Sequence, residues 1–256
     1  MYERTNFRKI QIGLALVLVA VGIRTLVFFR ERNASPIKQV HQESAPIDAD
    51  NYVVPHKLYA YDLKSARAGL VGKPVWVKAG YGVAFYPYNS ASKRADFTHG
   101  TGLLAPIEQL DIKDIVLNRG PNSVGEWQGP PGAQFRVHKD EQQIIAVFAI
   151  NGKDYAFPIG VVSNSDYHFM ADDMLFTQDP HQLYKHWPAD VWQAIDQHQV
   201  KPGMTDLQAD FAIGVGLMDP SSDSIDKKMN YPNGGKPLTI TFHDGKAMDI
   251  RPGPAS

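Results

Sequence analysis

The feature that most constrains this chain is a long apolar run close to its N-terminus. The run extends from Ile10 to Phe29 (IQIGLALVLVAVGIRTLVFF), with basic residues on both sides. As a helix at about 1.5 Å per residue it is roughly 30 Å long, which is the thickness of a bilayer core. Arg24 is its one charged residue, and the long stem can carry the guanidinium toward the interface. The run predicts one membrane-spanning helix over 10–29 after a short tail over 1–9.

Two alternatives to a retained span stay open. A cleaved signal peptide would use residues 1–9 as its basic region and Ile12 to Ile23 as its apolar region. After that region the chain reads RTLVFFRERNAS, with bulky and charged residues where a signal peptidase needs small ones. A buried core helix is the other alternative, and the bracketing basic residues and the polar segment that follows argue against it. We expect an uncleaved signal-anchor.

The charges beside the run leave its orientation open. Three basic residues precede the run and three follow it: Arg4, Arg8 and Lys9, then Arg30, Arg32 and Lys38. Since the positive-inside rule does not decide, the lengths of the flanks are the remaining guide. A short tail before a large domain is typical of a signal-anchor. We expect a single-pass protein of the inner (cytoplasmic) membrane with its globular part outside the cytoplasm.

The composition of the chain excludes several classes of function and of site. The 256 residues are 43% hydrophobic and 21% charged, which is typical of folded proteins and fits two soluble units. The 26 Lys and Arg residues are balanced by 27 Asp and Glu residues, so no cationic excess favours binding to nucleic acid. The absence of cysteine excludes disulfides, thiolate metal sites, a cysteine nucleophile and a lipidated N-terminal cysteine.

A polar tether is predicted over 30–55 and a β-rich domain over 56–178. The clearest element is a hairpin in which the apolar strand Ile144 to Ile150 is followed by Asn151-Gly152, which suits a type I′ turn, and by KDYAFPIG. Pro158 cannot donate to a ladder, so we expect the returning strand to end there or to lie at an edge. The strand spacing suggests an SH3-like barrel.

Two long segments interrupt these strands and read as loops. They are Tyr86 to Gly102 and Asn118 to Gln134, which are rich in Gly, Pro, Ser and Asn. Their aromatic residues Tyr86, Tyr88 and Trp127 are candidates for stacking on a glycan ring or for anchoring a partner. The alternative is that the loops fold back and cover the barrel.

The segment over 179–256 predicts two helices followed by three strands. Val191, Trp192 and Ile195 share one helical face after Pro188. A second helix begins at the capping box Thr205-Asp206-Leu207-Gln208 and ends at Gly214. Strands follow at Tyr231, at Leu238 to Phe242 and at Lys246 to Ile250, the last two joined by Asp244-Gly245. The fold class expected for the whole chain is α+β, with a two-layer αα-βββ domain at its C-terminus.

The run KPGMTDLQ (Lys201 to Gln208), the Tyr231 strand and the closing LTITFHDGKAMDI resemble the SmpA/OmlA (BamE-like) domain of small bacterial envelope lipoproteins. That family's pattern is a G-M-T/S-x-x-Q helix start and a hairpin ending in F-x-D/N-G-K, and the likeness covers about 186–251. It implies an αα-βββ fold and a bacterial envelope setting. The chain departs from the family in lacking the lipobox cysteine and in its Gly214-Val215-Gly216, so no family contact is carried over.

Catalytic and metal chemistry find little support in the sequence. His181, His186 and His198 lie near aspartates, but no pair has the i, i+4 spacing that stacks two ligands on one helical face. Ser90-Ala91-Ser92-Lys93 matches S-x-x-K without the companion motifs of serine acyl enzymes. We therefore predict no enzyme activity, no metal and no cofactor.

The function expected is that of a non-catalytic envelope protein that binds a partner protein or acts as a scaffold. A glycan-binding module and an unrecognised hydrolase remain the alternatives. The last strand is expected at a sheet edge, which makes Lys246 and Met248 candidate partner contacts through strand addition.

Overall fold

The computed structural model describes residues 19, 21–30, 49–80, 82–119, 141–220, 222 and 226–253. The chain divides into two compact units, Met1–Ile47 and Asp48–Ser256. Within the described ranges no helix is long and apolar enough to cross a membrane. The first unit is helical at residue 19 and over 21–30. The predicted transmembrane signal-anchor over 10–29 is thus corrected, and its earlier positions, except Val19, lie outside the described residues.

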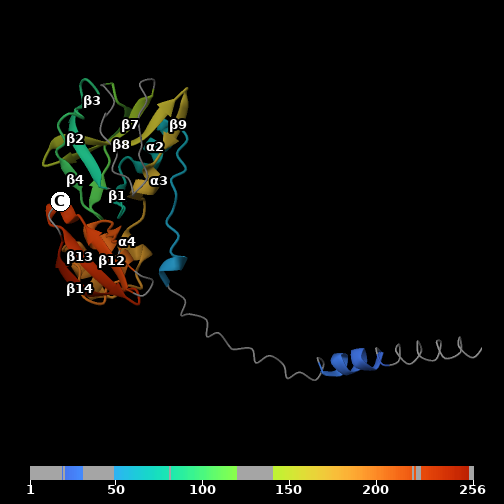
Figure 1. Cartoon of the computed structure of the whole chain (residues 1–256). Coiled ribbons are helices and arrows are strands. Elements are labelled where there is room, and N and C mark those ends of the chain that lie inside the picture. The colour runs from blue at the N-terminus through green and yellow to red at the C-terminus, as the bar shows by residue number, and fades with distance from the viewer. Residues whose placement is uncertain are drawn as a thin grey trace, which may run out of the picture. The chain divides into compact units, whose positions relative to one another are not determined.

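The second unit is a mixed α/β structure built mostly from antiparallel sheets (Figure 1). Its largest sheet has the order β3-β2-β8-β7-β6, with β4 also pairing β2 and β9 also pairing β8. The strands are β2 (Val83–Asn89), β3 (Arg94–Ala95), β4 (Gly102–Leu104), β6 (Asp114–Leu117), β7 (Gln142–Ile150), β8 (Lys153–Ser163) and β9 (Asp166–Phe169). Residues 86–89, 94–95 and 102 of the segment predicted as a loop over 86–102 are therefore strand.

A smaller sheet completes this region. Its order is β10-β1-β5, with β10 (Leu175–Phe176), β1 (Pro74–Val77) and β5 (Gln109–Asp111). Helices α2 (Leu63–Leu70) and α3 (Ala171–Met174) pack their buried residues into the same hydrophobic core as the sheets. The sheets are open: the path of the large sheet runs from β3 to β6 without a pairing between those two strands. Because a barrel closes only when its outer strands pair, the suggested SH3-like barrel is wrong.

The β7–β8 hairpin forms as its sequence predicts. Asn151 and Gly152 both have positive φ, 50° and 76°, and Ile150 pairs with Lys153 across the turn. The expectation for Pro158 is wrong, because β8 continues through it to Ser163 in the interior of the sheet. Pro158 is tolerated because the β7–β8 register shifts beside it, and because β8 pairs β2 only up to Ala156 and β9 only from Gly160.

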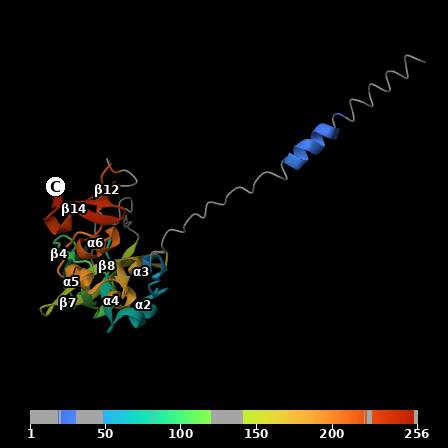
Figure 2. The same cartoon turned by 90° about the horizontal axis from the view of Figure 1, so that it is seen from below.

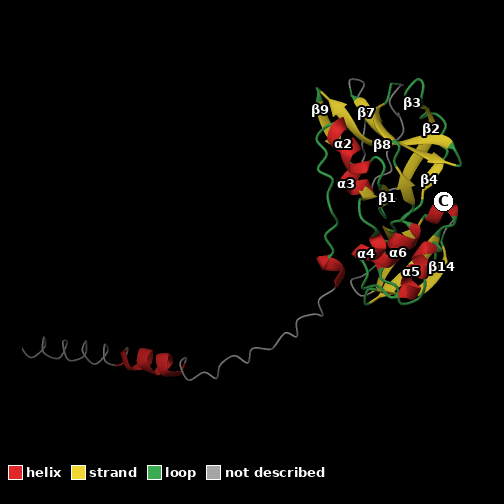
Figure 3. Cartoon of the chain, turned by 180° about the vertical axis from the view of Figure 1, so that it is seen from behind, coloured by secondary structure: helices red, strands yellow, loops and turns green. Residues whose placement is uncertain are grey.

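The C-terminal region pairs helices with a four-stranded sheet, and α5 and α6 lie together beside it (Figure 3). The helices are α4 (Pro180–Leu183), α5 (Ala189–Asp196) and α6 (Asp206–Ile213), and the strands are β11 (Leu217–Met218), β12 (Asp226–Tyr231), β13 (Leu238–His243) and β14 (Lys246–Pro252). The sheet order β11-β12-β13-β14 adds β11 to the expected three-strand meander. The capping box of Thr205 and Gln208 forms, and Asp244 and Gly245 turn with φ of 48° and 71°.

The two predicted domains, 56–178 and 179–256, both lie inside the unit Asp48–Ser256. The core of the C-terminal region contains Phe176 of β10, and Trp76 of β1 and Ile107 pack against it. Apolar contacts therefore continue across residue 178.

An extended segment before α2 runs along the side of this unit (Figures 1 and 2). We call residues 49–62 the strap. It begins with the 3-10 helix η1 (Ala49–Tyr52), continues without regular structure and ends at Asp62, whose side chain caps α2. Its first part belongs to the predicted tether over 30–55, the rest of which is described only at residue 30.

Candidate functional site

The loop aromatics predicted as ligand contacts are packed within their own chain where they are described. Tyr86 and Tyr88 lie at the outer end of β2, and burial raises the pKa of both hydroxyls. The Tyr86 ring meets the Phe97 ring edge-on at 4.9 Å, and Tyr88 packs on the cluster around Val116. Trp127 lies outside the described residues. The structure therefore leaves little free ring face on Tyr86 and Tyr88 for stacking on a sugar.

Lys246 and Met248 lie on the edge strand β14, but part of that edge is already used. The Ala247 N–H donates to the Met204 carbonyl at 2.8 Å, and the Ala247 carbonyl accepts from the Gly203 N–H at 2.8 Å. Met248 is 65% exposed and sits where the β13–β14 register shifts. An incoming strand would therefore have to displace the loop at Gly203 and Met204 from the first half of the edge.

The histidines that the sequence places near aspartates form separate pairs. His181 lies between Asp179 and Asp196, His186 contacts Asp50, and His198 contacts the Ala212 carbonyl. In the described part of the chain no three His, Cys, Asp or Glu residues are grouped so that they can hold a metal ion.

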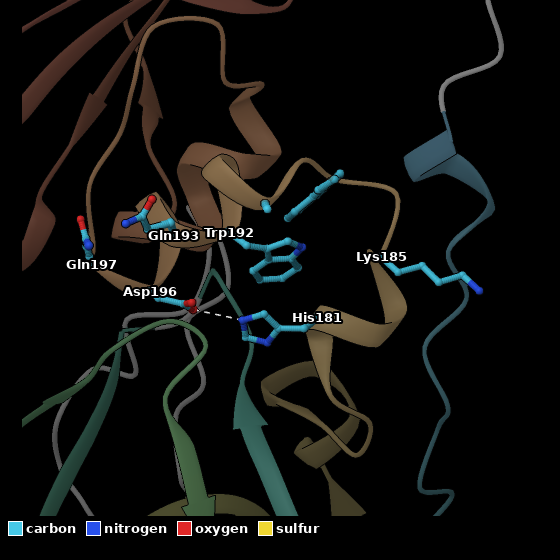
Figure 4. Close-up of a pocket in the computed structure, with 8 residues that line it drawn as sticks. His181, Lys185, Trp192, Gln193, Asp196 and Gln197 are labelled. Carbon is cyan, nitrogen blue, oxygen red and sulfur yellow. Dashed lines mark hydrogen bonds and ion pairs between the residues drawn. The ribbon is translucent and has the colours of Figure 1, made fainter.

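A pocket of about 570 Å³ opens beside His181 (Figure 4). Helix α4 contributes His181, and helix α5 contributes most of the remaining wall. The lining residues are His181, Lys185, Trp187, Ala189, Trp192, Gln193, Asp196 and Gln197. The two tryptophans supply the apolar floor, but they are only 5% and 8% exposed, so the accessible rim is mostly polar.

His181 ties α4 to α5 at the pocket. Its Nδ1 lies 3.0 Å from Asp179 Oδ1 and its Nε2 lies 3.1 Å from Asp196 Oδ1. Both contacts are hydrogen bonds only when the ring carries both protons, because a carboxylate accepts and does not donate. The ring also stacks on Trp192, with centroids 4.1 Å apart. His181 thus covers the Trp192 ring, and both of its ring nitrogens contact aspartates. We therefore interpret it as a structural residue that joins α4 to α5 in the pocket wall.

The strap borders the segment between α4 and α5, and the carboxylate of its own residue Asp50 holds it there. Trp187 Nε1 donates to Asp50 Oδ1 at 2.6 Å, and His186 Nε2 lies 2.6 Å from the same oxygen. Lys185 points from the pocket toward the strap in Figure 4. Trp187 of the pocket wall therefore contacts Asp50 of η1 directly.

Side chains also hold the middle of the strap. Asp172 accepts the Leu58 N–H on Oδ1 and the Tyr59 N–H on Oδ2 at 3.3 Å. Gln178 Oε1 accepts the His56 N–H at 3.1 Å, and Lys78 donates to the Asp172 carbonyl. These contacts replace the ladder that the strap lacks, since it belongs to none of the described sheets.

The strap presents a row of large side chains to solvent. Tyr52, Val54, Tyr59 and Tyr61 are 69%, 82%, 76% and 76% exposed. Tyr59 has a φ of 49°, in the left-handed region that bulky residues rarely adopt, and Asp172 bonds the backbone on its N-terminal side. Strain of this kind persists only where surrounding contacts fix the backbone, so the direction of the row is set by the fold.

The sequence interpretation missed this row because it divided the segment between a tether and the start of a domain. One signal was present, since three of the chain's 11 tyrosines stand within ten positions, Tyr52 to Tyr61. Val54 follows the same exposed pattern, whereas Val53 and Leu58 pack on the two hydrophobic cores. No known protein family, no curated protein sequence and no solved structure matches this chain.

Proposed function

We propose that this protein is a non-catalytic interaction module and that a partner protein binds the exposed row of the strap, Tyr52, Val54, Tyr59 and Tyr61. The observation that carries the proposal is that these four large side chains stand in solvent on a backbone that Asp50 and Asp172 hold in place. Single exposed apolar residues are ordinary on a protein surface, but a fixed row of them is typical of an interaction site.

The chemistry of the row favours a protein partner. Tyrosine offers a large apolar face and one hydroxyl at a low cost in conformational entropy, which is why it is enriched at interfaces. A row whose backbone is already fixed also avoids part of the ordering cost of association.

A bacterial envelope setting is the second part of this proposal. It rests on the resemblance of residues 186–251 to the SmpA/OmlA (BamE-like) domain. The helix–sheet layering of the C-terminal region is compatible with that resemblance, and the added strand β11 is a departure from it.

Site-specific photo-crosslinking tests the partner site. A photoreactive amino acid is placed at Tyr61 in the full chain, expressed at its natural level in its native cells. Leu103 is the matched control, because it is 57% exposed on β4, on the side of the unit away from the strap in Figures 1 and 3.

We expect a discrete crosslinked protein from position 61 and none from position 103. The product should disappear when Tyr52, Val54 and Tyr59 are all changed to serine in the same chain. Equal labelling from positions 61 and 103, or a product that survives the triple substitution, would show that the row is not a docking site.

A further inference from the structure

The charged groups along the strap are distributed unevenly. Lys57, Lys64 and Lys185 are exposed and make no hydrogen bond or ion pair within the described residues. The neighbouring carboxylates are occupied instead: Asp50 accepts from Trp187, and Asp172 accepts from the strap backbone. Asp50 and Asp172 are thus engaged within the chain and the three lysines stay in solvent, while Asp173, next to Asp172, is exposed as well.

The three lysines are spread along the row. Lys185 precedes His186, which contacts Asp50 in η1. Lys57 lies between Val54 and Tyr59, and Lys64 stands in the first turn of α2, three positions after Tyr61.

We propose that the occupant of this surface is an acidic, extended segment of another protein, whose carboxylates meet Lys57, Lys64 and Lys185 while its apolar side chains lie against the tyrosines. This rests on the proposed function and adds the chemistry of the partner. Complementary charge of this kind steers encounter and selects among partners more than it adds affinity. The geometry is linear, because the row follows one extended backbone, and a linear site suits an extended segment.

An anionic bilayer is the competing occupant for a surface of lysines and aromatics. Interfacial insertion uses Trp, Phe and Leu on the apolar side, whereas this row contains three tyrosines and one valine. The observations therefore favour the protein segment.

The experiment combines two variants of the full chain with the photoreactive residue at Tyr61. The first variant carries Lys57→Glu, Lys64→Glu and Lys185→Glu. The second is its control, with the same change in charge at three exposed lysines off the strap: Lys93→Glu, Lys153→Glu and Lys236→Glu. Circular dichroism and thermal unfolding confirm that both fold.

We expect the crosslink yield at position 61 to fall at least tenfold in the first variant and less than twofold in the second. Mass spectrometry should identify the crosslinked partner peptide as one with more Asp and Glu than Lys and Arg. A yield that is unchanged by the strap reversals, or a neutral or basic peptide, overturns the acidic-segment inference. The proposed function would survive that result, because it fails only if the serine substitutions of the row leave the crosslink intact.

The bilayer is tested with vesicles of phosphatidylglycerol and phosphatidylcholine. We expect parent and strap-reversal chains to cosediment with them equally. Vesicle binding that falls at least tenfold in the strap reversal, but not in its control, assigns the surface to anionic lipid and overturns the inference.

Discussion

Two extended segments of the same unit, β8 and the strap, are held in different ways. Strand β8 pairs with β7 along its length and with β2 and β9 on its other side, and its residues Ala156 to Val161 are buried. The strap joins none of the described sheets, and side chains such as Asp172 and Gln178 accept its backbone N–H groups. A strand ladder pairs the backbone N–H and C=O groups of β8, so both of its faces can pack in the core. The strap is fixed instead by hydrogen bonds to side chains, and one side of it stays in solvent. The comparison separates a segment that stabilises the fold from one that presents a surface.

The largest effect is expected in β8. Phe157 is fully buried, and its ring lies 5.7 Å from that of Phe148, so Phe157→Ala leaves a cavity in the core. We expect a loss of about 3–5 kcal/mol in the free energy of unfolding. Urea unfolding of the full chain measures it, with Tyr61→Ala as the matched aromatic truncation on the strap. A smaller loss for Phe157 than for Tyr61 would reverse the comparison.

Between pH 4 and 8 the pH dependence of unfolding should come mainly from Asp210 in the C-terminal region. Asp210 Oδ1 and the Tyr231 hydroxyl are buried, and neither has a hydrogen-bond partner of normal geometry among the described residues. Gly216 packs so closely that a Cβ would lie 2.7 Å from the Tyr231 ring. Burial raises the pKa of Asp210 to about 7, and the charge of Asp206 contributes to the rise. The N–H of Gly216 and the charge of Lys227 act in the opposite direction and lower the pKa.

A raised pKa means that the folded state binds the proton more tightly than the unfolded state. The stabilisation that this group contributes is therefore fully present below about pH 4 and is lost as the pH rises through about 7. The total loss in the free energy of unfolding is up to about 4 kcal/mol. Asp210→Asn should remove the slope, and Asp172→Ala should leave it in place. Urea unfolding between pH 4 and 8 compares them, and a slope that persists in Asp210→Asn would contradict the assignment.

An intermediate loss of stability is expected when Asp172, which binds the strap backbone, is changed. Asp172→Ala removes the acceptor of the Leu58 and Tyr59 N–H groups, which should cost about 1–3 kcal/mol if the strap stays docked and less if it detaches. Hydrogen exchange at these two amides should accelerate at least tenfold, while exchange in β8 changes little. Asp172→Asn is the control, since its amide oxygen can still accept from Leu58. Uniform acceleration throughout the unit would show that the strap is part of the cooperative core.

The smallest change in stability is expected from the row itself. Tyr52→Ser and Tyr61→Ser remove side chains that are mostly in solvent, so the free energy of unfolding should change by about 0.5 kcal/mol or less. The same substitutions should abolish partner capture. A loss above about 2 kcal/mol would mean that these tyrosines serve the fold.

Local signals in the sequence predicted the C-terminal elements well. The capping box at Thr205 and the Asp244-Gly245 turn depend on neighbouring residues, and both form. Strand β11 has two residues and depends on pairing with Met229 and Asn230, beyond the reach of a local pattern. For the same reason the sequence missed the strap, which is held by residues more than 100 positions away.

The sequence predicted less about the candidate site. The tyrosines of the row carry no motif, and their exposure follows from Asp172 and Trp187 holding the strap in one position. Tyr86 and Tyr88 had the same composition signal, yet strand β2 places them against Phe97 and Val116. Periodicity does not distinguish these cases, because the partner side chains come from elsewhere in the chain.

The central claim, that the strap row is covered by a partner, is tested most directly by accessibility in cells. The chain has no cysteine, so Tyr61→Cys and Leu103→Cys each place one thiol at a known exposed position. A permeant maleimide is applied to native cells and to the purified full chain, and the labelling rates are compared. We predict that Tyr61→Cys reacts at least tenfold more slowly in cells than when purified, whereas Leu103→Cys reacts at rates within a factor of two. Equal rates for Tyr61→Cys in cells and in the purified chain would contradict the account.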